Sequence, residues 1–349
     1  MHTLVVGDGF IPASVYVSAL RDRLGPEFGP IRTVELAGDK NVQHERQQVM
    51  ETQGPNAVDA PPEVLAAVAD AGVLCVHFAP VGEKVLAAAD ALRLVAVART
   101  GLENVDLEAA TARGIGVVPV YGRNAGAVAE LQIGLMLAEA RNIARADNSI
   151  RAGGWRKDFP GARIEIAGRT VGMVGFGHVG SHFARRLAGF RCRLVAYDPY
   201  APDTLLDACE VTRAATLDEV FAESDFVVVQ VRHSAETDRF IGADQFALMK
   251  PEAYFINVAR SRVVDNEALY EALDEGRIAG AGLDVYDDEP LPRHSPWRRL
   301  DNVTLTTHFG GDTDETNTTS AALVADTVVE YAEHGRVRSA ANAEALGWA

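Results

Sequence analysis

Short apolar runs alternate with amphipathic stretches along most of the chain, and this alternation predicts strands that alternate with helices. In the first part of the chain we expect strands at residues 4–7, 31–36, 73–77, 94–98 and 114–118. Helices are predicted at residues 11–24, 63–69 and 83–89, and Asp106 is expected to cap another. Strands separated by helices form parallel sheets. Roughly the first 120 residues are therefore expected to form one α/β unit of ordinary domain size.

The pattern weakens in residues 37–62, where polar side chains predominate and Gly54, Pro55, Pro61 and Pro62 occur. Glycine and proline are the strongest local interruptions of regular structure. We predict that this segment is mostly loop, and its composition indicates no function.

Residues 124–146 form a long predicted helix whose apolar side chains are not confined to one face. They include Val128, Leu131, Ile133, Leu135, Met136 and Leu137. A helix that is apolar around most of its circumference has to be covered on several sides. We expect it to be buried between domains or between subunits.

Residues 170–198 combine a buried strand, a glycine-rich turn, a helix, a second strand and a final acid, Asp198. The turn reads Gly175-Phe176-Gly177-His178-Val179-Gly180. This order is the dinucleotide-binding fingerprint, although a glycine-rich turn by itself is common in α/β proteins. Gly175 permits the tight turn, Gly177 lets a pyrophosphate approach the backbone, and Gly180 lets the helix pack on the strand.

Asp198 indicates which dinucleotide binds. Its carboxylate can accept hydrogen bonds from ribose hydroxyls and would repel a 2′-phosphate. We therefore predict NAD as the cofactor in preference to NADP.

Further strands are predicted at residues 226–230, 253–258, 279–285 and 303–307, and a last helix at residues 315–334. The chain after Thr313 is too short to form a third unit. We therefore expect a discontinuous substrate-binding domain, residues 1–122 plus 312–349, into which an NAD-binding Rossmann domain, residues 123–311, is inserted. The predicted class is α/β, with two Rossmann-like or flavodoxin-like domains, parallel sheets and an active site in the cleft between them.

The composition narrows the class of protein. The chain has 349 residues, 48% of them hydrophobic and 23% charged, which is typical of a globular protein. A net charge of −16 argues against a nucleic-acid partner. Neither a signal peptide nor an apolar run long enough to span a bilayer is present, so no membrane partner is expected. Three cysteines without a CxxC pair indicate a reducing, cytoplasmic location and no metal site.

Three side chains that suit one reaction follow neighbouring predicted strands: Arg260, Glu289 and His308. Taken singly, such an Arg is usually in a surface ion pair, such a His is usually structural, and the acidic run 287–289 is usually a solvated loop. In a parallel sheet, however, all three fall at the edge that carries the glycine turn. Reduction of a 2-keto acid needs a cation for the carboxylate, a proton donor for the oxygen, and a carboxylate that keeps the donor charged.

The chain resembles the D-isomer-specific 2-hydroxyacid dehydrogenase family, which includes D-3-phosphoglycerate dehydrogenase and glyoxylate/hydroxypyruvate reductases. The resemblance is close from residue 94 to residue 316 and loose before that. The motifs that carry it are NVDLEAATARGI (104–115), AVAELQIGLMLAEAR (127–141), VGMVGFGHVG (171–180), INVARSRVVDNEAL (256–269), AGLDVYDDEPLP (281–292) and NVTLTTHFGG (302–311).

The resemblance implies an NAD-dependent 2-hydroxyacid dehydrogenase in which Arg260 binds substrate, His308 is the acid/base and Glu289 is its partner. It also implies that Asp284 contacts the nicotinamide. Further cofactor contacts are expected at Val231, Arg232, Ala259, His308 and Gly310. Substrate contacts are expected at Phe78, Arg99, Thr100 and Gly101, and the turn Arg99-Thr100-Gly101-Leu102 would offer backbone N–H groups to the carboxylate. The helix near 124–141 is expected to form part of a homodimer interface.

Two departures from the family pattern concern the substrate and the cofactor. The loop after Val76 lacks the Arg or Lys typical of members that bind phosphorylated substrates, which favours an unphosphorylated acid, although Arg99 or a partner subunit could supply charge. Arg232 stands in the loop after Val229, where it is either solvent-exposed or in contact with substrate or pyrophosphate. Glu289 argues against the formate dehydrogenase branch, where Gln is expected.

Two other functions remain compatible with these motifs. One is an NAD(H)-sensing interaction protein, since a corepressor group shares the fold and the motifs. The other is an enzyme that holds NAD permanently as an internal redox group.

Overall fold

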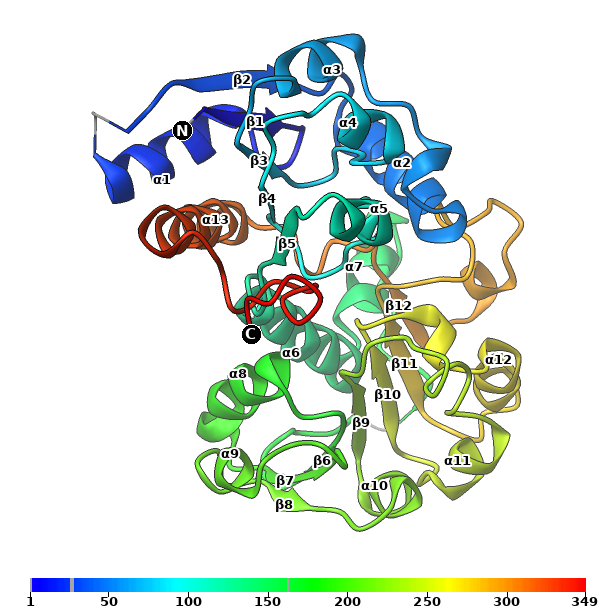
Figure 1. Ribbon diagram of the computed structural model, residues 1–349. Helices are drawn as coiled ribbons and strands as arrows, with labels where there is room; N and C mark the ends of the chain where they lie inside the picture. The colour runs from blue at the N-terminus through cyan, green and yellow to red at the C-terminus, as the bar shows by residue number, and fades with distance from the viewer. Residues whose placement is uncertain (1, 26–27, 162) are drawn as a thin grey trace. The chain divides into compact units, whose positions relative to one another are not determined.

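The computed structural model describes residues 2–25, 28–161 and 163–349, and the chain forms two compact units (Figure 1). The first unit comprises residues 1–123 and 312–349, and the second comprises residues 124–311. The chain thus leaves the first unit, folds the whole second unit, and returns to the first.

A five-stranded sheet lies at the centre of the first unit, and all its paired strands are parallel (Figure 1). The strands are β1 Thr3–Gly7, β2 Ile31–Glu35, β3 Val73–Val76, β4 Leu94–Val97 and β5 Gly116–Pro119. Their order, β2-β1-β3-β4-β5, is that of flavodoxin-like doubly wound folds. The predicted α/β class with parallel sheets is confirmed for this unit.

Both faces of this sheet are covered by apolar side chains. Along β3, Leu74 and Val76 join one buried cluster, whereas Val73 and Cys75 join another. The covering helices are α1 Ala13–Leu24, α2 Lys40–Gln53, α3 Pro62–Val68, α4 Glu83–Ala87, α5 Leu107–Ala112 and α13 Asp314–His334. Because α13 packs against α1 in the second of these clusters, the C-terminal segment completes the core of the first unit.

The prediction of a loop over residues 37–62 is wrong, because α2 occupies much of the segment and the short 3₁₀ helix Pro55–Ala57 follows it. Asp39 caps α2 by accepting a hydrogen bond from the Val42 N–H. The buried face of the helix consists of Gln43, Gln47 and Met50. Helical spacing is present, but two of these three residues are polar, so no apolar periodicity marks the helix.

The second unit contains a seven-stranded sheet, also with all its paired strands parallel. Its strands are β6 Thr170–Val174, β7 Arg193–Tyr197, β8 Thr212–Arg213, β9 Phe226–Val229, β10 Tyr254–Asn257, β11 Gly280–Leu283 and β12 Val303–Leu305. The order β12-β11-β10-β9-β6-β7-β8 extends the Rossmann order by one strand. The winding direction reverses between β6 and β9, which is where doubly wound sheets bind ligands.

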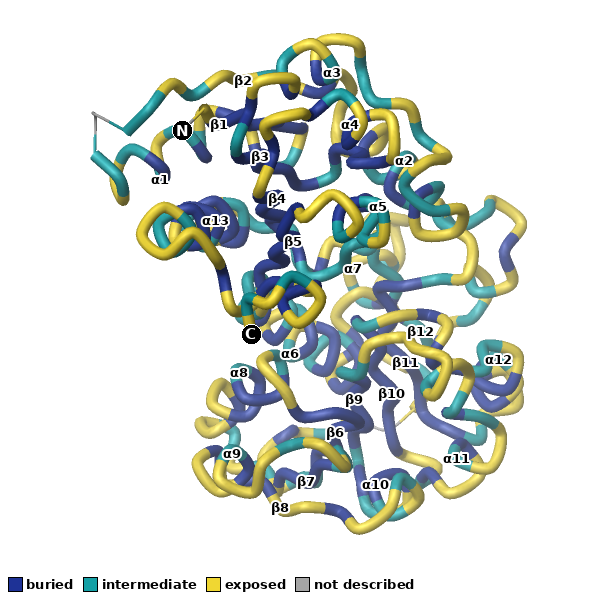
Figure 2. Tube along the Cα trace, viewed as in Figure 1, coloured by how far each residue is buried: buried dark blue, intermediate teal, exposed yellow. Residues whose placement is uncertain are grey.

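Helices cover this sheet as well, and its central strands are buried along their whole length (Figure 2). Continuous apolar runs such as Phe226–Val229 are expected where a parallel strand is covered on both faces. The helices are α6 Ala125–Arg141, α7 Ile143–Arg151, α8 His178–Leu187, α9 Asp203–Asp207, α10 Leu217–Glu223, α11 Ala243–Leu248 and α12 Asn266–Asp274. Short 3₁₀ helices span Ala188–Phe190, Ser261–Val263 and Pro296–Arg299.

The helix predicted over residues 124–146 is in fact two helices, because α6 ends at Arg141 and α7 starts at Ile143. Asn142 between them adopts the left-handed conformation, with φ 55°. Asn tolerates this conformation better than most residues, so it can end one helix and begin another. Much of the apolar surface of α6 packs within the second unit, where Leu135 and Met136 join its core.

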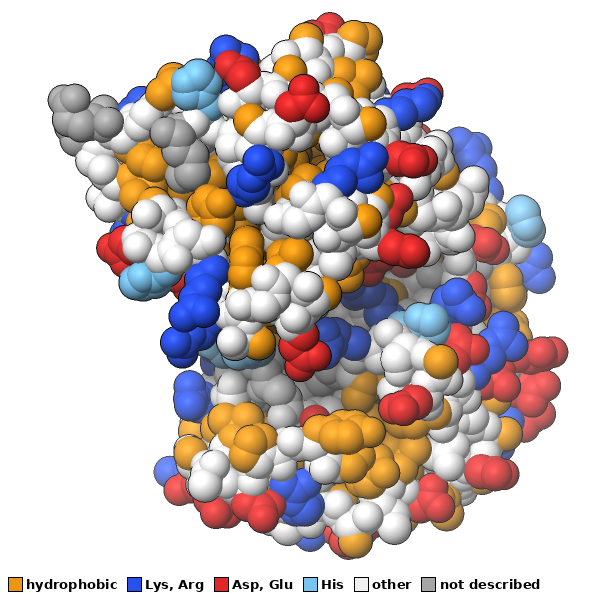
Figure 3. Space-filling model, in the orientation of Figure 1, with side chains coloured by type: hydrophobic (Ala, Val, Ile, Leu, Met, Phe, Trp, Pro, Cys, Tyr) orange, Lys and Arg blue, Asp and Glu red, His pale blue; other side chains and the backbone are white. Residues whose placement is uncertain are grey.

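The described residues contain no helix with both the length and the apolarity needed to cross a membrane. Cys75, Cys192 and Cys209 are free thiols. On the face drawn in Figure 3, basic and acidic side chains are interspersed.

Close packing of α6 on β11 predicts how a glycine substitution affects stability. A Cβ atom at Gly282 would lie 2.9 Å from Leu135 Cβ and 3.1 Å from Ile256 Cδ1. Gly282→Ala should therefore lower the free energy of unfolding, measured with urea, by about 1–3 kcal/mol.

The matched control is Gly134→Ala in α6, where a Cβ atom would meet nothing within 4 Å. Alanine is favoured over glycine in a helix by about 0.5–1 kcal/mol, so this variant should be as stable as the parent or more stable. Equal effects of the two substitutions would contradict the packing described for β11.

Candidate active site and cofactor site

The glycine turn lies between β6 and α8, at the point where the winding of the sheet reverses. Gly175 has φ 94°, and a Cβ atom there would lie 2.7 Å from Val231 Cγ1. At Gly180 a Cβ atom would lie 2.8 Å from the ring of Phe176. Both positions thus require glycine, the first for its backbone conformation and both for their close neighbours.

Gly177 differs from these two glycines, because a Cβ atom there would meet no atom within 4 Å. It is the N-cap of α8 and provides no side-chain hydrogen bond to the first turn of the helix. Open space beside Gly177 and N–H groups at a helix start are what the pyrophosphate of a dinucleotide requires. The residues present therefore fit the predicted cofactor.

Asp198 follows β7 and closes the glycine turn. Its carboxylate accepts hydrogen bonds from the backbone N–H groups of Phe176 (2.8 Å), Tyr200 (2.8 Å) and Ala201 (3.1 Å). A cavity of about 590 Å³ lies beside it, and Tyr197, Pro199, Pro202 and Ala214 are among the residues that line it. Its place next to the acid suits the adenosine half of a dinucleotide.

Arg213 also lines this cavity, but its guanidinium group is held by the protein. It donates to one oxygen of Asp203 at 2.9 and 2.7 Å, and to the carbonyl oxygens of Asp198 and Ala201, each at 2.6 Å. Engagement of this cation by Asp203, together with the charge of Asp198, disfavours a 2′-phosphate.

The three predicted catalytic residues follow adjacent strands of the second sheet. Arg260 follows β10, Glu289 follows β11 and His308 follows β12. Because these strands are parallel, their carboxyl ends lie at one edge of the sheet, which is also the edge of the glycine turn after β6.

His308 and Glu289 are in direct contact, with Nδ1 of the histidine 2.6 Å from Oε2 of the glutamate. The Glu289 side chain is only 7% exposed, and its Oε1 accepts a hydrogen bond from the Tyr286 N–H at 2.9 Å. The carboxylate is thus held in place by its own loop. Its contact with Nδ1 orients the imidazole ring.

Asp284 holds the loop that carries His308. Its buried carboxylate accepts hydrogen bonds from the Thr306 hydroxyl (2.6 Å) and from the N–H groups of Phe309 (3.2 Å) and Gly310 (2.9 Å). His308 lies between these anchors with φ 55°, in the left-handed region. The observed role of Asp284 is therefore to fix this loop, and its contact with the nicotinamide stays a prediction.

Asn257, the last residue of β10, shapes the turn that leads to Arg260. Its side chain accepts a hydrogen bond from the Ala259 N–H and donates one to the Arg260 carbonyl oxygen, each at 3.0 Å. The Arg260 side chain is exposed, and its Nη1 donates to the Ala259 carbonyl oxygen at 2.7 Å. Arg232 is likewise exposed, so its predicted contact with substrate or pyrophosphate stays a prediction.

The predicted substrate-binding residues lie at the carboxyl edge of the first sheet. Phe78 follows β3, and the guanidinium carbon of Arg99 lies 5.2 Å from the centre of its ring. Arg99 Nη2 is 3.3 Å from Glu51 Oε1 and 3.2 Å from Glu103 Oε2. Thr100 donates its hydroxyl to the Val120 carbonyl oxygen at 3.0 Å, and Gly101 is the next residue. Arg99 thus shares its charge with two carboxylates.

A buried pair that sequence reasoning did not single out lies at the same edge. His77 Nδ1 is 3.1 Å from Asp8 Oδ2, and both side chains are almost completely buried. Burial lowers the pKa of His77 to about 4, and the nearby Asp8 opposes this shift without reversing it. His77 is therefore neutral at pH 7.

Three further polar residues beside Arg260 were also missed, namely Ser261, Asn266 and Asp287. The Ser261 hydroxyl donates to Asp287 Oδ1 at 2.6 Å. Nothing in the sequence pairs Ser261 with Asp287, because 26 positions separate them. Asp287 belongs to the acidic run, which by itself is typical of a solvated loop.

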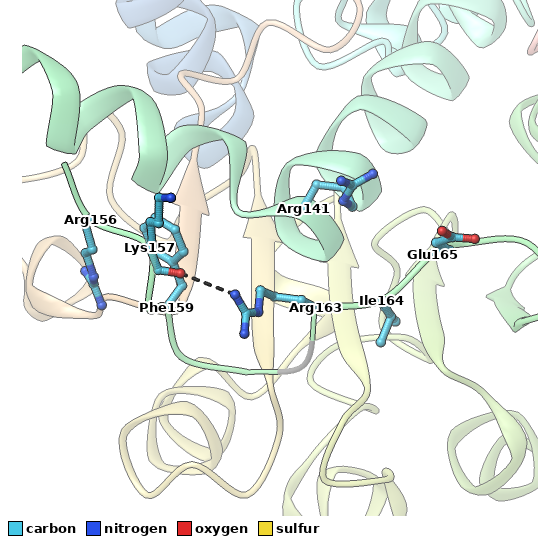
Figure 4. Close-up of a pocket in the computed structure, with 7 residues that line it drawn as sticks. All are labelled: Arg141, Arg156, Lys157, Phe159, Arg163, Ile164 and Glu165. Carbon is cyan, nitrogen blue, oxygen red and sulfur yellow. Dashed lines mark hydrogen bonds between the residues drawn. The ribbon is translucent and has the colours of Figure 1, made fainter.

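A second cavity in this unit, of about 410 Å³, is lined mainly by cationic side chains: Arg141, Arg156, Lys157, Phe159, Arg163, Ile164 and Glu165 (Figure 4). The segment that lines it leads into the start of β6, so the cavity is not part of the cofactor edge. Arg156 is neutralised there by Asp301, at 3.0 and 2.6 Å.

A doubly wound parallel domain with this glycine turn, acid and adjoining cavity is a dinucleotide-binding domain. Residues 133–310 match the family described as D-isomer specific 2-hydroxyacid dehydrogenase, NAD binding domain. The chain belongs to this family. The predicted family and the predicted NAD-binding domain are confirmed.

Relatives with nearly the same sequence identity to this chain are named for different substrates. The chain is 39% identical over 268 residues to D-3-phosphoglycerate dehydrogenase of Methanocaldococcus jannaschii, a match that covers 76% of this chain and 51% of the relative. It is 38% identical over 257 residues to hydroxypyruvate reductase of Thermotoga maritima, covering 72% of this chain and 82% of the relative. The chain spans about half the length of the D-3-phosphoglycerate dehydrogenases that it matches in Methanocaldococcus jannaschii, Archaeoglobus fulgidus and Mycobacterium leprae.

Solved structures share the fold over nearly the whole chain. One is the NADPH-dependent glyoxylate/hydroxypyruvate reductase of Sinorhizobium meliloti, with a TM-score of 0.70 and 28% identity. The match covers 96% of this chain and 95% of that structure. That relative is described as NADPH-dependent, so the shared fold does not by itself fix the choice between the two dinucleotides.

Asp198→Asn should weaken the discrimination against NADPH. The change removes one negative charge near the expected 2′-phosphate and keeps an oxygen that can accept hydrogen bonds. A charge contact near a protein surface is worth about 1–4 kcal/mol, so the ratio of the Kd values for NADPH and NADH should fall about tenfold or more. Quenching of protein fluorescence on titration with each dinucleotide measures both constants.

Asp207→Asn, an exposed change of the same charge at the end of α9, is the matched control and should leave the ratio unchanged. An unaltered ratio in Asp198→Asn would show that this acid does not select the cofactor.

The neutral state of buried His77 predicts a dependence of stability on pH. Its pKa is about 4 in the folded protein and about 6.5 in an unfolded chain, so between these values the unfolded state binds more protons. The contribution of neutral His77 to the free energy of unfolding is therefore fully present above pH 6.5. It decreases as the pH falls towards 4, by up to about 1.4 kcal/mol per pH unit. Urea unfolding at several pH values should show that His77→Gln loses this part of the slope, and identical slopes would contradict the assignment.

Proposed function

We propose that this protein is an NAD-dependent dehydrogenase of D-2-hydroxy acids, which in the reverse direction reduces 2-keto acids. The observation that carries the proposal is the 2.6 Å contact between His308 and Glu289 at the sheet edge that also carries Arg260 and the glycine turn. A histidine backed by a buried carboxylate is an acid/base, and an exposed arginine beside it can bind a carboxylate.

Each of the three side chains has a distinct task in this proposal. When bound, the reduced nicotinamide supplies the hydride that C2 of the keto acid accepts. Arg260 binds the substrate carboxylate through its planar guanidinium group. His308 uses Nε2 to donate a proton to the substrate oxygen, because its Nδ1 faces Glu289, and Glu289 holds the ring in the orientation that this transfer needs.

The substrate proposed is an unphosphorylated 2-hydroxy acid or sugar acid. The loop after β3 contains no Lys or Arg between His77 and Val81, and Arg99 already contacts Glu51 and Glu103. A phosphate would therefore meet little uncompensated positive charge from these side chains. Phe78, Arg99, Thr100 and Gly101 stay proposals for recognition of the acid.

Assembly and location are part of the same proposal. A homodimer through the helix near 124–141 is supported by the resemblance and by the partly buried apolar side chains of α6, such as Val128 and Ile133. A cytoplasmic location is supported by the free thiols. The absence of a nucleic-acid partner stays a prediction based on the net charge.

His308→Gln is the direct test of the proposed reaction. Loss of the proton donor should lower kcat by roughly 10²–10⁴-fold, while NADH still binds because Gln keeps much of the side-chain volume. The measurement is the loss of NADH absorbance with a panel of 2-keto acids that includes glyoxylate, hydroxypyruvate and 3-phosphohydroxypyruvate.

The matched control is His294→Gln, an exposed histidine of the same unit, which should behave as the parent protein. A parental kcat in His308→Gln would disprove the acid/base assignment. Tight NADH binding by the parent without turnover of any acid would instead favour an NAD(H)-sensing protein.

A further inference from the structure

Ser261, Asn266 and Asp287 form a closed triangle of hydrogen bonds in the second unit. The Ser261 hydroxyl donates to Asp287 Oδ1 at 2.6 Å. Asn266 Nδ2 is 2.8 Å from Ser261 Oγ and 2.9 Å from Asp287 Oδ1. Every side of the triangle is thus a hydrogen bond, and Ser261 is 6% exposed.

The triangle joins three segments that are far apart in the sequence. Ser261 directly follows Arg260 in the loop after β10, and Asn266 is the first residue of α12. Asp287 stands in the loop after β11, two positions before Glu289. The segment that carries Arg260 is therefore tied to the segment that carries Glu289.

The backbone around Arg260 is held on its other side as well. Asn257 bonds to the Arg260 carbonyl oxygen, and the Val264 N–H donates to the Ser261 carbonyl oxygen, each at 3.0 Å. The Arg260 side chain itself is exposed. The backbone of Arg260 is therefore held by neighbouring residues, while its guanidinium group makes one hydrogen bond, from Nη1 to the Ala259 carbonyl oxygen, and is exposed.

We propose that Asp287, with Ser261 and Asn266, is a positioning residue that sets where Arg260 stands relative to the Glu289–His308 pair. The inference rests on the proposed function, since it gives Arg260 the substrate carboxylate to bind. Asp287 touches neither substrate nor cofactor in this scheme. Asp287 acts by holding Ser261 in place, and Ser261 is the residue next to Arg260.

Loss of the triangle should lower the kcat/KM for the keto acid and leave the Kd for NADH unchanged. If the Arg260 turn shifts, the guanidinium group can no longer bind the substrate carboxylate in the position that aligns C2 with the nicotinamide and the substrate oxygen with His308. A displacement of about 1 Å costs up to roughly 100-fold in rate. Asp287→Ala should therefore lower kcat/KM for the keto acid roughly 10- to 100-fold, with a raised KM and an unchanged Kd for NADH.

Two variants separate the hydrogen bonds from the charge. Asp287→Asn keeps an oxygen that can accept from Ser261 and should restore most of the activity. Asp288→Ala removes the same charge from the neighbouring exposed position and should match the parent protein. All four proteins are compared by steady-state kinetics with the best keto acid and by NADH titration.

A parental kcat/KM in Asp287→Ala, or an equal loss in Asp288→Ala, would overturn the proposal. So would a loss in Asp287→Ala that Asp287→Asn shares in full, because charge alone would then explain it. Rescue by Asn with an unchanged Kd for NADH supports it.

A measurement without catalysis keeps the inference separate from the proposed function. If the parent protein reduces no keto acid, the proposed function fails, and amide hydrogen exchange of the Val264 N–H still tests the brace. Exchange should be faster in Asp287→Ala than in the parent or in Asp288→Ala. Unchanged exchange would show that the triangle does not hold the turn.

Discussion

The buried carboxylate of Asp284 is the interaction on which the geometry of the candidate active site depends. It accepts three hydrogen bonds from the loop that follows β12, on both sides of His308. The left-handed conformation of His308 costs about 1–2 kcal/mol for a residue with a Cβ atom. Hydrogen bonds to a charged group contribute about 1.5–3 kcal/mol each, so three of them outweigh this strain. The histidine can therefore be held in an unfavourable backbone conformation that brings its Nδ1 to Glu289.

Polar bridges between successive loops extend this constraint across the sheet edge. Parallel pairing places the loops after β10, β11 and β12 side by side. Asp287 joins the loop after β11 to Ser261 after β10, and Glu289 joins it to His308 after β12. The middle loop therefore contacts both of its neighbours. The carboxylates of Asp287 and Glu289 have different partners: Asp287 binds a hydroxyl and an amide, and Glu289 contacts an imidazole.

Asp198 has an observed structural role, and the predicted preference for NAD rests on the same side chain. It accepts the Phe176 N–H and so holds the glycine turn against the end of β7. The same negative charge stands beside the cavity that suits adenosine, where Arg213 is engaged by Asp203. Both oxygens of Asp198 accept backbone N–H groups. Asn keeps one of these acceptor oxygens and Ala keeps none, so Asn is the more informative replacement.

The sequence by itself determined the elements whose signal is local. Apolar runs such as 226–229 mark buried parallel strands, and the Gly175–Asp198 arrangement identifies the NAD-binding domain. The order of strands and motifs also placed Arg260, Glu289 and His308 at one edge. Helix α2 escaped detection because Gln43 and Gln47 occupy its buried face, and the break at Asn142 was missed because it depends on a single backbone dihedral angle.

Only the tertiary structure decided which side chains meet. The carboxylates at 284, 287 and 289 belong to one short stretch, yet they bind the His308 loop, Ser261 and the His308 ring, respectively. Arg99 pairs with Glu51, which comes from the helix that the pattern did not reveal. Hydrogen bonds and ion pairs have ranges of a few ångströms, and partners separated by many residues come within that range only when the strands are placed in their final order.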